Sequence, residues 1–538
     1  GWLDEAVFLE SISGELNWQQ KQDNWKLSAN QLQLWNEDLN LSLNGRVEQL
    51  NQQLDTDLRL DLQDVKVNRW RQYVPQKIIP EDFERWSRNA FREGVIRRGY
   101  IEMQGSPGAF PFDESPEKGQ FAMQMEVENT QLHYAEGWPD IKQVDGTISG
   151  QGNNLLIESQ SGTIAGFAFN QVTTTIENLV RPQPVLRVDG LLNGSTPDAL
   201  AFLQNSPLKQ RFGQVADWLQ TTGSSDISLQ LMVPLVNPDN TQATGHVTFA
   251  DSALSTSAVP GLQVTNINGK LNFDNNGVLA EAITAKAFEQ GISVDVKPES
   301  GQTAVVINGR AGIPALRLQW PDFIPAFVSG ESAYQTRIAI NEPEPGQFDV
   351  AVNVQSDLAG VAINTPSPLG KTANQPAMLR LNIENRDQTL YRLSLGDWLK
   401  TALSVSDDNL SGEGRLGGEA ACVGGEGLNI SGRLEQLNLD AWLDWQSELP
   451  ATTASSTIPI STLDVRIQQL QLARQKLKDI AISASQTAGQ WEIGLNSAQI
   501  KGDIQWPHSV TNQRPLNIQL AHLRLDLDQS ADEAPASE

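Results

Sequence analysis

Hydrophobic and polar residues alternate along most of this chain. The clearest runs are Leu58, Leu60 and Leu62; Met123, Met125 and Val127; Leu229, Leu231 and Val233; and Val350, Val352 and Val354. A period of two is typical of strands with one face away from water and the other in it. The chain is therefore predicted to be mainly β, with one apolar sheet face.

Helical spacing of apolar residues is confined to short segments. We expect helices near residues 81–92, 198–220 and 439–446. Asn-Gly pairs lie between many of the apolar runs, and such pairs favour tight hairpins. Examples are Asn44-Gly45, Asn193-Gly194 and Asn276-Gly277. The pattern predicts a long antiparallel sheet with a few short helices.

Internal similarity indicates that the sheet is repetitive. Residues 141–148 read Ile-x-x-Val-x-Gly-x-Ile, and residues 264–271 read Val-x-x-Ile-x-Gly-x-Leu. A weaker third copy begins at Leu477 and Ile480. Repeated hairpins at this scale predict an elongated structure built by stacking.

The apolar face of such a sheet has to be covered. A second sheet covers it in a β-sandwich, whereas acyl chains cover it in a folded, gutter-like sheet. Alternation fits both arrangements equally well, so the pattern alone leaves both open.

Composition and charge narrow the possible functions. The 538 residues exceed one ordinary hydrophobic core, and 39% of them are hydrophobic, which indicates a folded chain. A net charge of -26 argues against nucleic acid as a partner. No apolar run reaches the length of a membrane-spanning helix. Residues 1–10 lack a signal-peptide pattern, so we expect a segment of a longer protein.

The residues that usually carry catalysis or metal binding do not form recognisable motifs. Four histidines are scattered singly: His133, His246, His508 and His522. Cys422 is the sole cysteine. Ser206 to Lys209 fits an S-x-x-K pattern without the motifs that accompany it in serine enzymes, and we interpret it as a helix start. The glycine-rich segment 417–427 lacks the end of a phosphate-binding loop, and we interpret it as a hairpin loop. We therefore expect no catalytic residue, metal or cofactor.

A series of motifs resembles the central region of YhdP-type, AsmA-like envelope proteins. They are Trp70-x-x-Tyr73-x-Pro75, Gly99-Tyr100-Ile101, Phe110-Pro111-Phe112, Gly119-Gln120-Phe121, Leu132-His133-Tyr134, Trp138-Pro139, Gly146, Gly166, Ser206-Pro207-Leu208, Val233-Pro234-Leu235 and, farther on, Pro366 to Lys371. Each motif is weak alone, but their order extends over much of the chain.

The resemblance implies a long, curved β-sheet that forms an elongated apolar groove, of the β-taco or bridge-like lipid-transfer type. It implies a periplasmic protein that guides phospholipids between the inner and outer membranes and supports the outer-membrane barrier. It also implies that an N-terminal inner-membrane anchor and an outer-membrane contact lie outside these residues. The expected partners are phospholipid acyl chains, and no enzymatic activity is expected.

On this interpretation the chain divides into successive parts of the groove. They are residues 1–75, the motif region 76–235, a repeated hairpin segment 236–365, a further segment 366–525 and an acidic, disordered tail 526–538. The twelve alternating residues named at the start are the candidates for acyl-chain contact. The alternative is a scaffold or adhesin of stacked β-sandwiches that binds proteins or glycans, and a glycan hydrolase on a β-solenoid ranks third.

Overall fold

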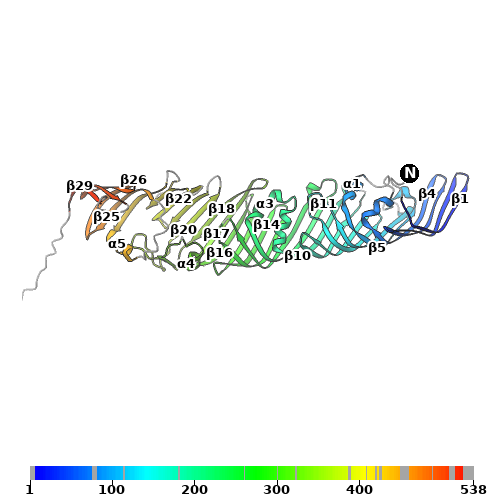
Figure 1. Ribbon diagram of the computed structural model, residues 1–538, viewed down its shortest axis with the longest axis horizontal. Helices are drawn as coiled ribbons and strands as arrows, with labels where there is room; N and C mark the ends of the chain where they lie inside the picture. The colour runs from blue at the N-terminus through cyan, green and yellow to red at the C-terminus, as the bar shows by residue number, and fades with distance from the viewer. Residues whose placement is uncertain are drawn as a thin grey trace, which may run out of the picture. The chain divides into compact units, whose positions relative to one another are not determined.

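The chain forms strands along most of its length, as the computed structural model shows (Figure 1). Residues 7–524 are described, except 75–80, 113–115, 180–181, 258, 260, 300, 322–323, 386–388, 407–408, 419–420, 423–426, 449–459, 488 and 508–514. The expected tail 526–538 and His508 lie outside the described residues. Two compact units, Gly1–Ile283 (unit 1) and Thr284–Glu538 (unit 2), are described in turn.

Unit 1 is an antiparallel sheet in which each strand pairs with the next one along the chain. Its strands are β1 (Ser11–Lys21), β2 (Asn24–Asn36), β3 (Leu39–Leu50), β4 (Gln53–Lys66), β5 (Phe91–Gly105), β6 (Gly119–Leu132), β7 (Ile141–Gln151), β8 (Asn154–Ile164), β9 (Phe167–Ile176), β10 (Val185–Ser195), β11 (Leu219–Pro234), β12 (Gln242–Thr256) and β13 (Gln263–Asp274). The division between the units falls within β14 (Gly277–Ala287).

The α-helices described in unit 1 lie at one edge of this sheet. They are α1 (Glu81–Ala90), α2 (Thr196–Gln204) and α3 (Lys209–Trp218), as the spacing of apolar residues predicts. Short 3-10 helices are η1 (Val67–Tyr73), η3 (Pro107–Ala109), η4 (Pro116–Lys118) and η5 (Pro238–Asn240). Ser195 begins α2 with a capping box, in which its hydroxyl accepts from the Asp198 amide and the Asp198 carboxylate accepts from the Ser195 amide.

Unit 2 continues the β architecture with shorter strands in its middle. Its strands are β15 (Gln290–Glu299), β16 (Gln302–Gly312), β17 (Val328–Glu344), β18 (Gln347–Ser356), β19 (Val361–Ile363), β20 (Leu379–Asn385), β21 (Thr389–Leu395), β22 (Leu399–Ser406), β23 (Asn409–Leu416), β24 (Leu428–Asn438), β25 (Ile460–Leu472), β26 (Gln475–Thr487), β27 (Gln490–Asn496), β28 (Ile500–Pro507) and β29 (Asn517–Leu523). The helices described in this unit are α4 (Ile313–Gln319) and α5 (Leu439–Glu448).

Two pairings in unit 2 differ from the predicted antiparallel order. Strand β24 is parallel to both β23 and β25, so the sheet is mixed. The glycine-rich segment 417–427 therefore connects parallel strands, and its interpretation as a hairpin loop is wrong. The Cys422 amide donates to the Glu413 carboxylate at 2.8 Å, so Cys422 lies beside the side chain of Glu413. The prediction of a mainly β chain with a curved sheet and a few short helices is confirmed.

Among the described α-helices, α4 was not predicted. Strand β16 leads into α4, whose first turn contains Pro314. Proline is favoured there because the first amide hydrogens of a helix have no partner within it. The proline was a usable signal, but α4 has only seven residues and shows little apolar periodicity.

The internal repeat corresponds to a recurring β-bulge. Gln143, Asn266 and Asp479 occupy equivalent positions in the three copies, and their φ angles are 54°, 51° and 50°. An extra residue in this conformation turns the following side chain back to the same face, so that apolar residues three apart share a face. Bulges also increase the local twist and bending of a sheet.

Two of the three predicted Asn-Gly turns are wrong. Asn44-Gly45 lies inside β3 and Asn193-Gly194 lies inside β10, whereas Asn276 does lie in a turn and Gly277 begins β14. Gly45 has a φ of 128°, and a Cβ there would lie 1.9 Å from the Asp57 carbonyl oxygen. The glycine is required by the close approach of the neighbouring backbone, and not by a change in chain direction.

Candidate functional site

A continuous row of mostly apolar side chains crosses the sheet of unit 1 from β1 to β12. In antiparallel strands, residues that pair directly point to the same face, so the register defines the row. Its members, in order, are Ile12, Leu34, Leu41, Leu62, Gly99, Met125, Ile148, Ile157, Thr174, Val188, Leu231 and Ala243. Three candidates from separate runs, Leu62, Met125 and Leu231, therefore lie in one line across the sheet.

A second row runs beside the first, two residues along each strand. From β2 to β11 it consists of Leu32, Leu43, Leu60, Ile101, Met123, Gly150, Leu155, Ile176, Leu186 and Val233. The glycines leave room for larger neighbours. A Cβ on Gly150 would lie 2.8 Å from Met123 Cγ, and one on Gly99 would lie 3.1 Å from Met125 Cγ. Both methionine side chains thus lean over a neighbouring strand.

Unit 2 contains a comparable row from β15 to β29. It consists of Val294, Ile307, Thr336, Val354, Leu381, Leu393, Thr401, Gly414, Ile430, Leu463, Ala484, Ile493, Ile504 and Ile518. The candidates Val350 and Val352 lie on the same face of β18 as Val354, because alternate residues of a strand share a face. Each unit therefore has one apolar face, which we call the lane face.

The side chains of the lane face are covered only in part. Of the twelve candidates, Leu62 and Val127 are buried, with 8% and 9% exposed, and the other ten are half-buried. Tightly buried clusters are local: Leu39, Leu62 and Val65 in unit 1, and Val465, Ile467, Leu470, Leu477 and Ile480 in unit 2. The core of a closed sandwich buries its inward side chains fully along each strand. Partial exposure along whole rows is what an open face produces.

The opposite face is polar and carries ion pairs between neighbouring strands. Arg59 on β4 lies 2.8 Å from Asp61, pairs with Glu102 on β5, and stacks over the ring of Tyr100 at 4.6 Å. Although desolvation opposes it, hydrogen bonds from the Arg59 side chain to these two carboxylates raise the pKa of Arg59. In unit 2, Arg337 and Lys297 donate hydrogen bonds to Glu299 and lower its pKa to about 2.

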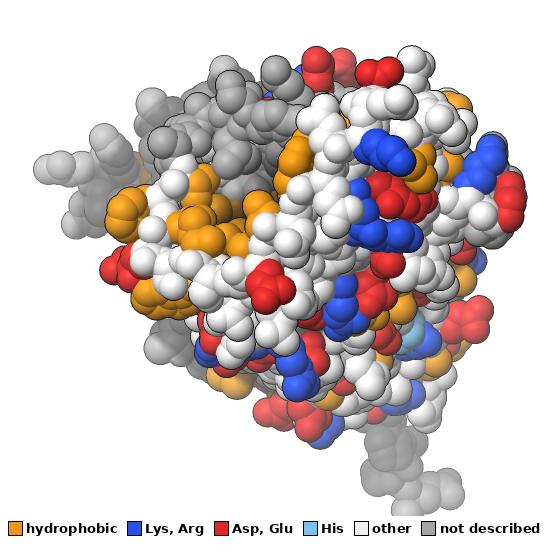
Figure 2. Space-filling view, turned by 90° about the vertical axis from the view of Figure 1, so that its right-hand side faces the viewer, with side chains coloured by type: hydrophobic (Ala, Val, Ile, Leu, Met, Phe, Trp, Pro, Cys, Tyr) orange, Lys and Arg blue, Asp and Glu red, His pale blue; other side chains and the backbone are white. Residues whose placement is uncertain are grey.

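At one end of unit 1, the two kinds of surface are visible together. Figure 2 looks at the end where β1 lies and shows hydrophobic side chains gathered in one part, with charged side chains of both signs over much of the rest. On β1, Ile12, Leu16 and Trp18 are 63%, 60% and 58% exposed. The apolar side chains of this strand therefore lie open to solvent.

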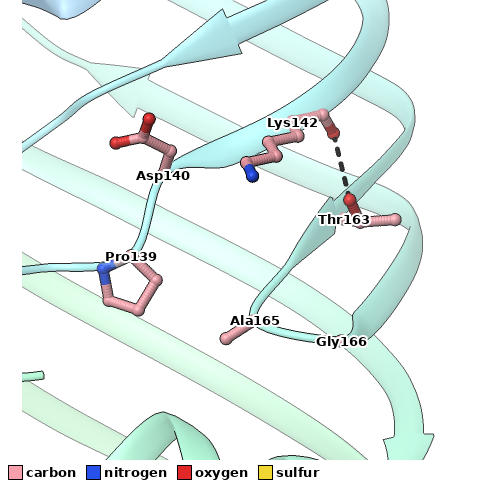
Figure 3. Close-up of a pocket in the computed structure, with 6 residues that line it drawn as sticks. All are labelled: Pro139, Asp140, Lys142, Thr163, Ala165 and Gly166. Atoms are coloured by element: carbon pink, nitrogen blue, oxygen red, sulfur yellow. Dashed lines mark hydrogen bonds between the residues drawn. The ribbon is translucent and has the colours of Figure 1, made fainter. Parts of the chain in front are cut away.

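A pocket of about 320 Å³ lies at the helix-bearing edge of unit 1 (Figure 3). It is lined by Pro139, Asp140, Lys142, Thr163, Ala165 and Gly166. The Asp140 carboxylate accepts one hydrogen bond from the Gln131 side chain and lies 2.8 Å from His133 Nδ1. Because it combines two opposite charges with small side chains, the pocket does not resemble an acyl-chain site.

Within the described residues, no group of three His, Cys, Asp or Glu side chains is arranged to hold a metal ion. In the same part of the chain, no helix has the length and apolar character needed to cross a bilayer. Three tryptophans near segment ends pack against other rings: Trp70 on Phe83, Trp138 on Phe202 and Trp320 on Phe288.

The alternation of residues identified the face of each candidate strand but missed most of the row. Ile148 and Ile157 complete the first row across β7 and β8, and Ile101 continues the second row across β5. The strands of these three residues also alternate. The glycines in the row carry no hydrophobic signal at all. Only the register places them on the lane face.

The family model described as "YhdP protein" matches residues 2–538. The chain is 24% identical over 319 residues to the Escherichia coli (strain K12) protein named "Intermembrane phospholipid transporter YhdP". The match covers 59% of this chain and 25% of that protein, so the chain spans about a quarter of the length of its relative. No solved structure matches the chain.

Proposed function

Because this chain belongs to the YhdP protein family, we propose that it guides phospholipids between the inner and outer membranes along its lane face. The observation that carries the proposal is the unbroken row from β1 to β12 in unit 1, with its counterpart from β15 to β29 in unit 2. The name of the Escherichia coli relative is that of a phospholipid transporter, which agrees with this assignment.

Acyl chains need such a surface to cross water. Each CH₂ group removed from water contributes about 0.8 kcal/mol, so two long acyl chains exposed together cost on the order of 25 kcal/mol. Partly exposed Leu, Ile, Val and Met side chains offer a cover for acyl chains while the headgroup stays in water. The mechanism is passive guidance, and it requires no catalytic residue.

The composition of the lane face suits movement rather than storage. Its side chains are largely aliphatic and the rows are continuous, so neighbouring positions offer similar contacts. A site that binds much more tightly than its neighbours would hold the lipid in place. Numerous weak and similar contacts allow an acyl chain to slide.

We place this activity in the periplasm of a Gram-negative envelope. The anchor in the inner membrane and the contact with the outer membrane would come from parts of the protein outside this chain, and the transport would support the outer-membrane barrier. The alternative of stacked β-sandwiches is disfavoured because ten of the twelve candidate side chains are half-buried.

Lipid analysis of the purified chain tests the proposal. We expect mass spectrometry of an organic extract to detect phospholipids at levels well above those carried by an unrelated β-protein purified in parallel. Replacing Leu60, Met123 and Val233 together by Asp should remove most of that lipid. Equal lipid in the chain and in the unrelated protein would contradict the proposal.

A further inference from the structure

One edge of the sheet in unit 2 is set back over several strands. The registers align the ends of β18, β20, β21, β22 and β23 in one row, which consists of Ser356, Leu379, Leu395, Leu399 and Leu416. Gly432, within β24, is paired with the last of them. Strand β24 runs on past this row to Asn438, and β17 begins at Val328, well before the level of Ser356. Six further residues of strand correspond to about 20 Å. The short strands β20 to β23 therefore leave a recess between β17 and β24.

Leucines line the inner end of this recess. Leu379, Leu395, Leu399 and Leu416 are directly paired neighbours, and each is half-buried. They lie on the lane face, because Leu379 and Leu395 are two residues from Leu381 and Leu393 of the row in unit 2. The apolar face thus reaches the edge of the sheet at the recess.

Residues 357–378 enter the recess from the β17 side. Their strand β19 pairs with the start of β17, and Val361 is 2% exposed. The Lys371 ammonium is buried and donates to the carbonyl oxygens of Leu358 at 2.8 Å, Val361 at 2.6 Å and Thr372 at 3.2 Å. This segment, which we call the insert, has its own buried, hydrogen-bonded centre. It forms one side of the recess.

Helix α5 enters the recess from the β24 side. Its first turn is anchored: the Asp440 carboxylate accepts from the amides of Ala473 at 2.7 Å and Arg474 at 3.0 Å, in the turn between β25 and β26. Leu439 packs against the buried cluster around Ile467. The start of the helix is therefore fixed to the sheet.

The rest of α5 is held against the insert by two tryptophans. The Trp442 indole donates to the Ser367 carbonyl at 3.3 Å, and the Trp445 indole donates to the Asn364 carbonyl at 2.8 Å. The Trp445 ring also meets Phe327 with ring centres 5.4 Å apart. The two hydrogen bonds join residues that are 75 and 81 positions apart in the chain.

We call the contact between α5 and the insert the junction. Its two sides differ in how many side chains they bury. The insert buries Val361, Ile363 and Lys371, whereas α5 buries none of its residues. Segments with few buried contacts open at a lower free-energy cost than the body of a domain. Of the two sides, α5 therefore has the lower free-energy cost of opening, and its anchored first turn would be the hinge.

We propose that α5 is a gate over a lateral port, through which a phospholipid enters or leaves the lane face between β20 and β23. This inference rests on the proposed function. The leucine row gives acyl chains apolar contact from the edge inward, and the two indole hydrogen bonds hold the port closed. Access from the side would let lipid exchange at a point along the sheet and not only at its ends.

Photo-crosslinking in the full-length protein tests the port. A photoreactive phenylalanine analogue replaces Phe327 at the junction or, in a separate variant, Leu231 in unit 1. Both variants also carry Cys422→Ser, Ser367→Cys and Trp442→Cys. A short bis-maleimide then joins α5 to the insert, and a monofunctional maleimide on the same variants is the matched control. A linker is used because the reach of the tryptophan side chain places the two backbones too far apart for a disulfide.

The port predicts phospholipid adducts at position 327 with the monofunctional reagent and a fall to background with the bis-maleimide, while adducts at position 231 persist in both. Two results would overturn the port and leave the proposed function standing. In the first, adducts form at position 231 and none form at position 327. In the second, adducts form at both positions and the bis-maleimide does not change those at 327. Absence of adducts at both positions would overturn both.

Discussion

Val188 on β10 and Leu231 on β11 are directly paired and point to the same face of the sheet. Leu231 is also paired with Ala243 on β12, which has only a methyl side chain. Its neighbour Gln230 points to the opposite face, between Asp189 and Thr244. The two positions provide a matched pair for testing the lane face.

Leu231→Arg should stop phospholipid transfer while the protein remains folded. On an open face the arginine stem lies along apolar surface and its guanidinium reaches water, so the charge obstructs the lane without being buried. Transfer is measured in cells that depend on the protein, and folding by circular dichroism. Gln230→Arg, the control on the polar face, should leave both unchanged.

Loss of folding in Leu231→Arg would contradict an open lane. In a closed sandwich core the same arginine would be buried without a partner, which costs several kcal/mol. The free energy of unfolding therefore distinguishes the two architectures independently of any transport assay.

Gly45→Val should lower the free energy of unfolding by about 1–3 kcal/mol. The residue has a φ of 128°, and its Cβ would meet the backbone of Asp57. Urea denaturation measures the change. Gly108→Ala is the control, because no atom lies within 4 Å of a Cβ there, and it should have little effect. An equal, small effect of both substitutions would show that β3 and β4 are not so closely paired.

Unit 2 should lose stability as the pH falls from 4.5 toward 2. Hydrogen bonds from Arg337 and Lys297 lower the pKa of Glu299 from 4.5 to about 2. A carboxylate with a depressed pKa stabilises the fold above its unfolded value, and this contribution is lost as the folded form takes up its proton. The urea midpoint of Glu299→Gln should change less over this pH range than that of the parent chain. An identical pH dependence would show that Glu299 is not paired in solution.

Anionic vesicles should not retain this chain at low salt. Its net charge is -26, and basic side chains near α1 are paired with carboxylates, such as Arg71 and Arg88 with Glu84. Flotation with anionic liposomes measures binding. Binding that weakens as salt is added would reveal a basic surface and contradict this expectation.

How far the sequence predicts this structure depends on the range of each interaction. Alternation is local, so it correctly placed Met125 and Leu231 on apolar faces. Their membership of one row depends on register across several strands, and each bulge, such as the one at Gln143, shifts that register. The glycine-rich segment 417–427 was misread because turn residues do not reveal that the next strand runs parallel. The contact between Trp445 and Asn364 joins residues 81 apart and has no local signal.

Photo-crosslinking on both faces of the same strands tests the central claim most directly. Photoreactive residues are placed in the full-length protein in cells at Met125, Leu231 and Val352 and, as controls, at their neighbours Gln124, Gln230 and Ala351. The lane predicts phospholipid adducts at the first three positions and none at the controls. Equal labelling of the two faces, or no phospholipid at Met125, Leu231 and Val352, would contradict it.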